Sequence, residues 1–154
     1  MLIYSTPGTG KTEYLKYHVG YDGDHLLLRE LKKALSPSTE IPYQSNGTEI
    51  GEWICSLYKL GHSELIEKAY LNYEYVLSNH LTGSDKPLCL FGSVRLMHLA
   101  EKIYLEQDED LLRQRGKKHP RRIINNELSE ITANKLQYET LNGKFISDVL
   151  SDTK

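Results

Sequence analysis

The chain has 154 residues, of which 39% are hydrophobic and 26% are charged, and its formal net charge at pH 7 is -2. This length and composition are usual for one compact domain with a sizeable core, so we expect a single domain over residues 1–154. The charge gives no general reason to expect nucleic acid or an anionic membrane as a partner.

The sequence has no apolar run near the roughly 20 residues that span a bilayer, and its first residues lead into a strand rather than a signal sequence. We therefore expect a cytoplasmic protein, a monomer or homodimer, without a membrane partner. Cys55 and Cys89 lie far apart and have no neighbouring metal-ligand pattern, so we expect both to be reduced.

The first elements follow the order strand, loop, helix. Leu2–Tyr4 is a short apolar strand, residues 7–10 supply a turn, and Lys11–His18 begins a helix. The apolar run His25–Leu28 is interpreted as a second strand. A helix over LRELKKAL follows it and ends before Ser36-Pro37.

The remaining elements alternate between helices and strands. Trp53–Leu60 and Ser63–Leu81 have helical patterns, and PLCLFGS, VRLMHLAEK and KIYLE follow as strand, short helix and strand. A helical stretch then runs through ELSEITANKLQYETL, and GKFISDVL is interpreted as the final strand. This order predicts an α/β protein with a three-layer, doubly wound parallel sheet of about five strands.

The segment STPGTGKT, residues 5–12, has the pattern of a loop that wraps backbone N–H groups around phosphates. Lys11 supplies a cation, Thr12 offers a hydroxyl to magnesium, and Gly8 and Gly10 allow backbone geometries that side chains obstruct. The alternative is a structural glycine turn. The predicted nucleotide-binding residues are Ser5, Gly8, Thr9, Gly10, Lys11 and Thr12.

Two carboxylates, Asp22 and Asp24, stand where the second strand meets the phosphate loop. Asp22 could hold magnesium through water, and Asp24 could orient or deprotonate an attacking hydroxyl. The alternative is a polar turn without chemistry, because Asp and Gly are common in turns.

The loop resembles the Walker A motif of P-loop NTPases, with Ser5 in place of the first glycine. Together with YDGDHL, it makes the chain similar to the small P-loop kinases, a group that includes gluconate, shikimate and nucleoside monophosphate kinases. The resemblance covers most of the chain, but only the loop is a sharp motif. It implies a P-loop NTPase fold, with ATP and Mg²⁺ as cofactors and a nucleotide, nucleoside-like compound or small metabolite as phosphate acceptor.

The resemblance also implies roles for residues beyond the loop. Gly92 to Arg95 form a Gly-x-x-Arg arrangement in which Arg95 binds acceptor phosphate, with a surface charge as the alternative. Arg29, in GDHLLLR, is the candidate for the acceptor-binding arginine of nucleoside monophosphate kinases, although it comes later than that pattern expects. No acid follows LCLF, so the magnesium carboxylate expected there is missing, and either Glu106, after KIYL, or another acid would replace it.

The basic segment LLRQRGKKHPRR follows the fourth predicted strand and resembles a kinase lid, over residues 111–126. Arg113 and Arg115 would close over the phosphates and stabilise charge during transfer. The alternative is a solvated basic face.

We therefore expect an ATP-dependent phosphotransferase with Lys11, Asp24, Arg113 and Arg115 as catalytic residues. An AAA-like or switch-type ATPase is an alternative, because PGTGKT also resembles AAA loops. A nucleotide-binding interaction protein without catalysis is another.

Overall fold

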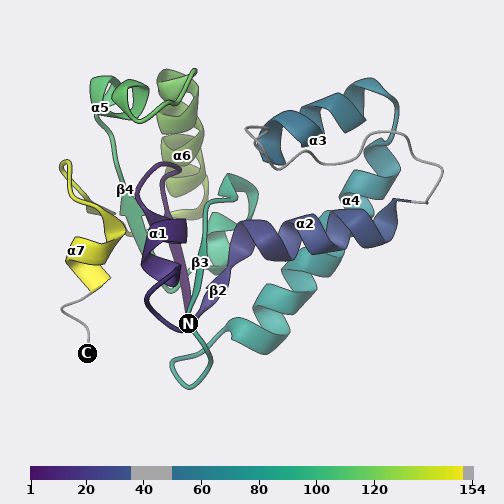
Figure 1. Ribbon diagram of the computed structural model, residues 1–154, viewed down its shortest axis with the longest axis horizontal. Coiled ribbons are helices and arrows are strands. Elements are labelled where there is room, and N and C mark those ends of the chain that lie inside the picture. The colour runs from purple at the N-terminus through teal and green to yellow at the C-terminus, as the bar shows by residue number, and fades with distance from the viewer. Residues whose placement is uncertain (36–49, 151–154) are drawn as a thin grey trace.

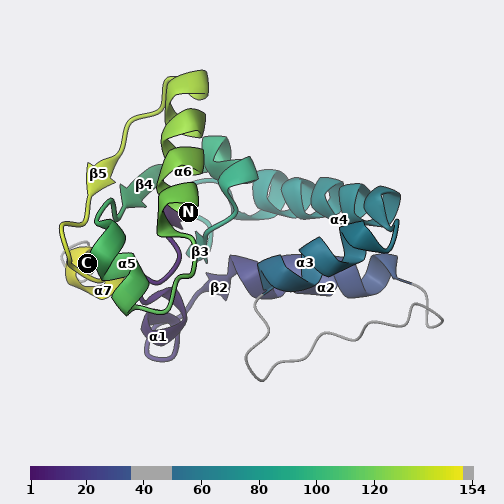
Figure 2. The ribbon, with the colours of Figure 1, turned by 90° about the horizontal axis from the view of Figure 1, so that it is seen from above.

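The computed structural model describes residues 1–35 and 50–150. Its centre is a five-stranded, all-parallel sheet in the order β2-β3-β1-β4-β5 (Figures 1 and 2). The prediction of an α/β fold with a parallel sheet of about five strands is confirmed. The strands are β1 (Leu2–Ser5), β2 (Tyr21–Asp22), β3 (Cys89–Phe91), β4 (Lys102–Leu105) and β5 (Glu139–Thr140).

Helices connect the strands and extend the molecule on one side. Helices α2, α3 and α4 lie together to the right of the sheet in Figures 1 and 2, whereas α7 lies to its left. The α-helices are α1 (Lys11–Leu15), α2 (Gly23–Ala34), α3 (Ile50–Lys59), α4 (Ser63–Val76), α5 (Glu109–Gln114), α6 (Pro120–Asn134) and α7 (Ile146–Leu150). A π-helical turn, Leu77–Leu81, continues α4, and a 3₁₀ helix, Val94–Leu99, follows β3.

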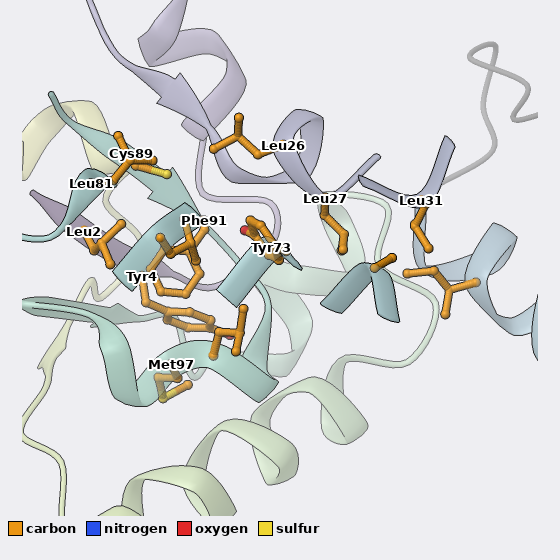
Figure 3. Packing of buried hydrophobic residues seen from close by; sticks show 14 of the residues in the cluster. Leu2, Tyr4, Leu26, Leu27, Leu31, Tyr73, Leu81, Cys89, Phe91 and Met97 are labelled. Carbon is orange, nitrogen blue, oxygen red and sulfur yellow. The ribbon is translucent and has the colours of Figure 1, made fainter. Parts of the chain in front are cut away.

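Side chains of the central strands alternate between two hydrophobic clusters. Leu2 and Tyr4 of β1 belong to the larger cluster, which also contains residues of α2, α4 and α6, and Figure 3 shows part of it. Ile3 belongs to a second cluster, which it shares with Ile146 and Leu150 of α7. Because successive strand residues point to opposite faces, this alternation means that helices cover the sheet on both sides.

The strand order reverses at β1. The chain leaves β1 for β2, returns to β3 beside β1, and then crosses to β4 on the other side of β1. Open α/β sheets bind ligands at the carboxyl end of the strands at such a switch point. The segment that follows β1 there is the glycine-containing loop.

The predicted strand His25–Leu28 is wrong, because these residues lie inside α2. The second strand is only the preceding pair Tyr21–Asp22, after which the Asp22 side chain caps the helix by accepting a hydrogen bond from the main chain of Asp24 at 3.0 Å. Leu27 and Leu31 are then buried one helical turn apart. A short apolar run is compatible with a buried strand and with a buried helix, and here the N-cap formed by Asp22 favours the helix.

The predicted final strand over GKFISDVL is also wrong. Ile146–Leu150 is helix α7, and the fifth strand is the exposed pair Glu139–Thr140, which the sequence placed in a helical stretch. Helix α6 ends earlier because Lys135 adopts a left-handed backbone with φ 53°. The chain is then extended and pairs with β4.

No helix within residues 1–35 and 50–150 combines the length and the apolar character that crossing a bilayer requires.

Replacing Gly23 with alanine is expected to destabilise the fold. A Cβ at this position would lie 2.4 Å from the Cβ of Phe91 and 2.6 Å from the hydroxyl of Tyr73, both of which are fully buried. Overpacking of this kind costs about 1–3 kcal/mol. We expect Gly23→Ala to lower the free energy of unfolding by that amount in urea titrations.

The matched control is Gly51→Ala in α3, because a Cβ at Gly51 meets no atom within 4 Å. This substitution is expected to be neutral or slightly stabilising, since alanine favours helix more than glycine does. Equal stability of the Gly23→Ala protein and the wild type would contradict the close approach of α2 to β3.

Candidate functional site

The loop between β1 and α1 takes its shape from two glycines. Gly8 and Gly10 have left-handed backbones with φ 84° and 86°, a region that strongly favours glycine. Gly10 is the N-cap of α1, and its carbonyl accepts a hydrogen bond from the main-chain N–H of Tyr14 at 2.9 Å. The two turns bring residues 6–10 back over the carboxyl end of β1.

Ser5 fits the position where the resemblance places a glycine. It is the last residue of β1, it is fully buried, and its φ is not positive. Its hydroxyl lies 2.9 Å from that of Thr9, which donates to the carbonyl of Thr6 at 2.6 Å. The serine therefore adds a hydrogen bond inside the loop without straining the backbone.

Lys11 places a buried cation at the centre of the loop. Its Nζ donates to the carbonyls of Ser5 at 2.9 Å and Thr6 at 3.2 Å, and the residue is only 8% exposed. Burial lowers the pKa of Lys11, while the charges of Asp24 and Asp22 act in the opposite direction. A Cβ at Gly92 would lie 3.2 Å from Nζ, so the glycine after β3 leaves space beside the ammonium group.

The two predicted carboxylates lie next to this lysine. Asp22 Oδ1 caps α2, and its Oδ2 accepts from the hydroxyl of Thr12 at 3.4 Å. Burial raises the pKa of Asp24, and the nearby charge of Lys11 opposes that rise. The structure thus places Thr12 and Asp22 in contact, with Asp22 and Asp24 near enough to Lys11 for their charges to act on it.

Glu127, a residue of α6, hydrogen-bonds to β1 and to the loop, and the sequence analysis did not predict it as a site residue. Its Oε2 accepts from the Tyr4 hydroxyl at 2.6 Å, and its Oε1 accepts from the Thr6 hydroxyl at 3.0 Å. Burial raises the pKa of Glu127 to about 7. The signal in the sequence was its spacing four residues before Ile131, which puts a carboxylate on the buried side of the helix.

Glu106, the predicted substitute for a magnesium carboxylate, holds main-chain groups instead. Its Oε2 accepts from the N–H groups of Gln107 and Asp108 at 2.9 and 3.2 Å, and its Oε1 accepts from that of Gly143 at 2.6 Å. The carboxylate of Glu106 thus accepts three main-chain hydrogen bonds and anchors the segment after β4 to the turn before α7.

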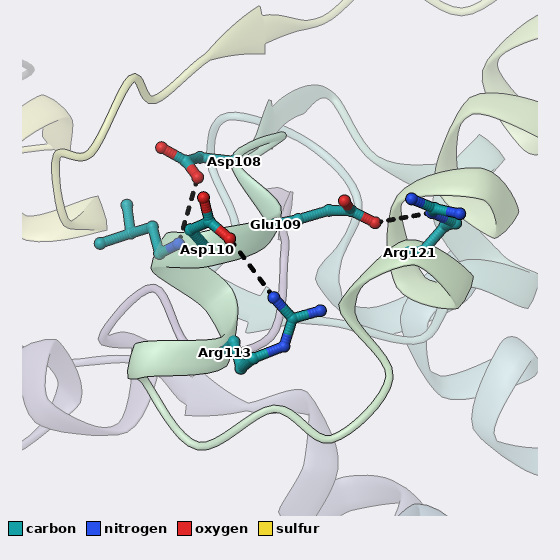
Figure 4. Close-up of polar contacts among 6 residues, drawn as sticks. Asp108, Glu109, Asp110, Arg113 and Arg121 are labelled. Atoms are coloured by element: carbon teal, nitrogen blue, oxygen red, sulfur yellow. Dashed lines mark hydrogen bonds and ion pairs between the residues drawn. The ribbon is translucent and has the colours of Figure 1, made fainter.

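Of the two predicted lid arginines, only Arg115 contacts the loop. It donates to the carbonyls of Gly8 at 3.2 Å and Gly143 at 3.0 Å, and its guanidinium lies 4.2 Å from the centre of the Phe145 ring. Arg113 instead pairs with Asp110 on its own helix at 3.3 Å (Figure 4). The segment predicted as a lid, residues 111–126, comprises most of α5, a connection and the start of α6.

Arg95 and Arg29, the predicted acceptor-binding residues, belong to two different helices. Arg95 of the 3₁₀ helix makes a two-point ion pair with Glu67 of α4 and stacks on Tyr70, with 4.2 Å to the ring centre. Arg29 lies 3.8 Å from Glu30 and lines an open groove along α2 with His25, Leu28, Lys32 and Lys33.

No family model matches the chain, and a search of curated proteins finds no match. Within the described ranges, no group of three or more His, Cys, Asp or Glu side chains is arranged to hold a metal ion. The site combines a buried lysine in a glycine-containing loop, two carboxylates beside it, and an arginine that reaches the loop from the segment after α5.

Glu127 is expected to make the stability of the protein depend on pH. Its pKa is about 7 in the fold, against an ordinary 4.5, so the fold favours the neutral carboxyl. This contribution is complete below the ordinary pKa and is lost as the pH rises through 7. By linkage, the loss is roughly 3 kcal/mol at most. Glu127→Gln, which stays neutral, should become more stable relative to wild type as the pH rises from 5 to 8.

Urea unfolding at several pH values measures this difference. Glu130→Gln is the control, because Glu130 is on the same helix and bonds only to Asn134 among the contacts found in the described residues. A difference between Glu127→Gln and wild type that stays constant with pH would contradict the assignment.

Proposed function

We propose that the chain is a P-loop kinase that transfers the terminal phosphoryl group of ATP to a hydroxyl group of a small acceptor. The observation that carries the proposal is the buried Lys11, whose Nζ donates to the carbonyls of Ser5 and Thr6 inside the loop, with the carboxylate of Asp24 in the first turn of α2 near enough to oppose the lowering of the pKa of Lys11 by burial. Nucleotide binding alone makes no demand on Asp24. A partly buried carboxylate beside Lys11 is positioned to act as the general base for an attacking hydroxyl.

The loop residues fit a nucleotide phosphate. The ammonium of Lys11 is bound to neutral carbonyl oxygens, and no ion pair within the described residues neutralises it. Phosphate oxygens are stronger acceptors for such a charge, and the loop adds backbone N–H groups. Ser5, Gly8, Thr9, Gly10, Lys11 and Thr12 would hold ATP, which supplies the transferable group. Thr12 and Asp22 would hold Mg²⁺, directly or through water.

Arg115 is the lid residue that supports the proposal. It reaches the loop at Gly8, where a Cβ would lie 3.1 Å from Cε of Lys117. A guanidinium and an ammonium at this end of the loop would neutralise phosphate charge during transfer. Arg113 would first have to leave Asp110, so we assign it a secondary role.

The raised pKa of Asp24 supports its role as a general base. A base with a higher pKa accepts a proton more readily, provided that it stays ionised at the working pH. The charge of Lys11 keeps the pKa from rising further. If no acceptor binds, the same geometry would support an ATPase, in which water receives the phosphoryl group and phosphate is released.

Lys11→Ala is expected to abolish acceptor-dependent ADP formation and to weaken ATP binding, because it removes the cation from the loop. Radiolabelled transfer and binding of a fluorescent ATP analogue measure the two effects. Lys16→Ala is the control, since Lys16 follows the same helix but is exposed and paired with Glu13. Turnover by Lys11→Ala at the wild-type rate would refute the site.

Asp24→Asn is expected to keep ATP affinity but to lower turnover by about 10²–10⁴-fold, the usual contribution of a positioned base. Asp22→Asn is the matched comparison. Asparagine caps a helix as well as aspartate does, so α2 should remain intact while the magnesium requirement rises. Acceptor-dependent turnover of Asp24→Asn within a factor of about two of wild type would exclude general-base catalysis by Asp24.

A further inference from the structure

We propose that Tyr73 is a further catalytic residue, whose hydroxyl donates a hydrogen bond to the acceptor oxygen that attacks ATP. This inference rests on the proposed kinase function and adds a second protein contact to the reacting hydroxyl. The feature that carries it is a pair of neighbouring groups without partners, a buried hydroxyl that has no acceptor and a carboxylate that has no donor.

The hydroxyl of Tyr73 lies inside the protein without a hydrogen bond. Tyr73 belongs to α4 and is fully buried, and Figure 3 shows its ring among the side chains of the larger hydrophobic cluster. Among the described residues, its hydroxyl oxygen is the only buried side-chain polar atom without a partner. Folded proteins satisfy nearly all such groups, because an unmade hydrogen bond is costly, so this exception requires a physical reason.

The hydroxyl lies against the turn that leads to the proposed base. A Cβ at Gly23 would lie 2.6 Å from the Tyr73 hydroxyl, and Gly23 directly precedes Asp24 at the start of α2. The same Cβ would lie 2.4 Å from the Cβ of Phe91, the last residue of β3. Tyr73 therefore reaches the carboxyl ends of β2 and β3, which is the edge of the sheet where the phosphate loop lies.

The side chain of Asp24 lacks a donor. Asp22 accepts from the main-chain N–H of Asp24, but no hydrogen bond from a described residue is directed at its carboxylate. Burial, followed by the charges of Cys89 and Asp24, raises the pKa of Tyr73 well above its ordinary value, so the hydroxyl keeps its proton at neutral pH. The hydroxyl of Ser93 lowers that pKa but is not in hydrogen-bonding geometry with Tyr73. A donor and an acceptor without partners thus meet at the first turn of α2.

A hydroxyl group of the acceptor would satisfy both groups at once, because its oxygen accepts from Tyr73 while its hydrogen is donated to Asp24. As this oxygen forms its bond to the terminal phosphorus of ATP, its proton passes to Asp24, and the bond from phosphorus to the bridging oxygen breaks to leave ADP. Tyr73 keeps its own proton and fixes the direction of attack. Catalytic hydrogen bonds often form only when the substrate is bound, which explains the missing partner in the free protein.

Tyr73→Phe tests the inference, because it removes the hydroxyl and keeps the ring. The urea midpoint of the free protein should equal or exceed that of wild type, since no hydrogen bond is lost. The affinity for a fluorescent ATP analogue should be unchanged. Adenosine, AMP, thymidine, glucose and glycerol are tested with labelled ATP, and kcat/KM for the one that is phosphorylated fastest should fall about 3–10-fold, the usual effect of one lost hydrogen bond.

Tyr75→Phe is the matched control, because Tyr75 lies on the same helix but is 59% exposed and packs against His80. It should leave kcat/KM unchanged, and an equal fall in both variants would overturn the role of Tyr73. A urea midpoint of Tyr73→Phe clearly below that of wild type would also overturn it, whatever the turnover, because the hydroxyl would then have a partner in the free protein.

The kinetics separate failure of this inference from failure of the proposed function. If an acceptor is phosphorylated and Tyr73→Phe uses it with the kcat/KM of wild type, the inference is overturned and the kinase function stands. If ATP binds but no acceptor is phosphorylated and phosphate is released to water alone, both the kinase function and the inference are overturned.

Discussion

The rest of the site depends on how the protein holds the ammonium of Lys11 inside the loop. A buried charge is costly unless it is hydrogen-bonded, and here the carbonyls of Ser5 and Thr6 solvate it. The loop can direct these carbonyls inward because Gly8 and Gly10 take left-handed backbones. The carboxylates of Asp24, Asp22 and Glu127 further stabilise the charged form. The lysine, the glycines and the acids are therefore parts of one electrostatic arrangement.

This arrangement is tied to the fold through the strand order. Because β1 lies between β3 and β4, its carboxyl end is flanked by Gly92 after β3 and Glu106 after β4. Glu106 donates its main-chain N–H to the hydroxyl of Thr6 at 2.9 Å, and that hydroxyl donates to Glu127. Strand β4 and helix α6 thus both fix the position of the loop, and the carboxylate of Glu106 holds the turn before α7 in the same assembly.

The sequence predicted the parts of the molecule that have a strong local signal. Strands β1, β3 and β4 are apolar and central, and the loop has glycines and a lysine at informative spacing. The edge strands were missed because Tyr21–Asp22 and Glu139–Thr140 are two residues long and carry no apolar pattern. The sequence analysis placed Asp22 and Asp24 near the loop, although the strand that it predicted at His25–Leu28 is part of helix α2.

The side-chain partners could not be predicted, because they come from residues far apart in the chain. Glu127 reaches Tyr4 and Thr6 across more than a hundred positions, and no local pattern records that contact. The contacts of Arg115 are a second case, whereas the partner of Arg113 lies only three positions before it. Arg113 forms an ion pair with Asp110 on its own helix, whereas Arg115 donates hydrogen bonds to the carbonyls of Gly8 and Gly143, which lie in two loops distant in the sequence. Charge alone does not separate them.

The short edge strands have a consequence for how the protein behaves at high concentration. Exposed sheet edges can pair with the edges of other molecules and begin aggregation, and proteins limit this by keeping edge strands short or charged. Strands β2 and β5 each offer only two residues, and Asp22 and Glu139 place a carboxylate on each. The strands that would make good templates, β1, β3 and β4, are enclosed between them. The sheet that builds the site is thereby shielded from edge-to-edge self-association.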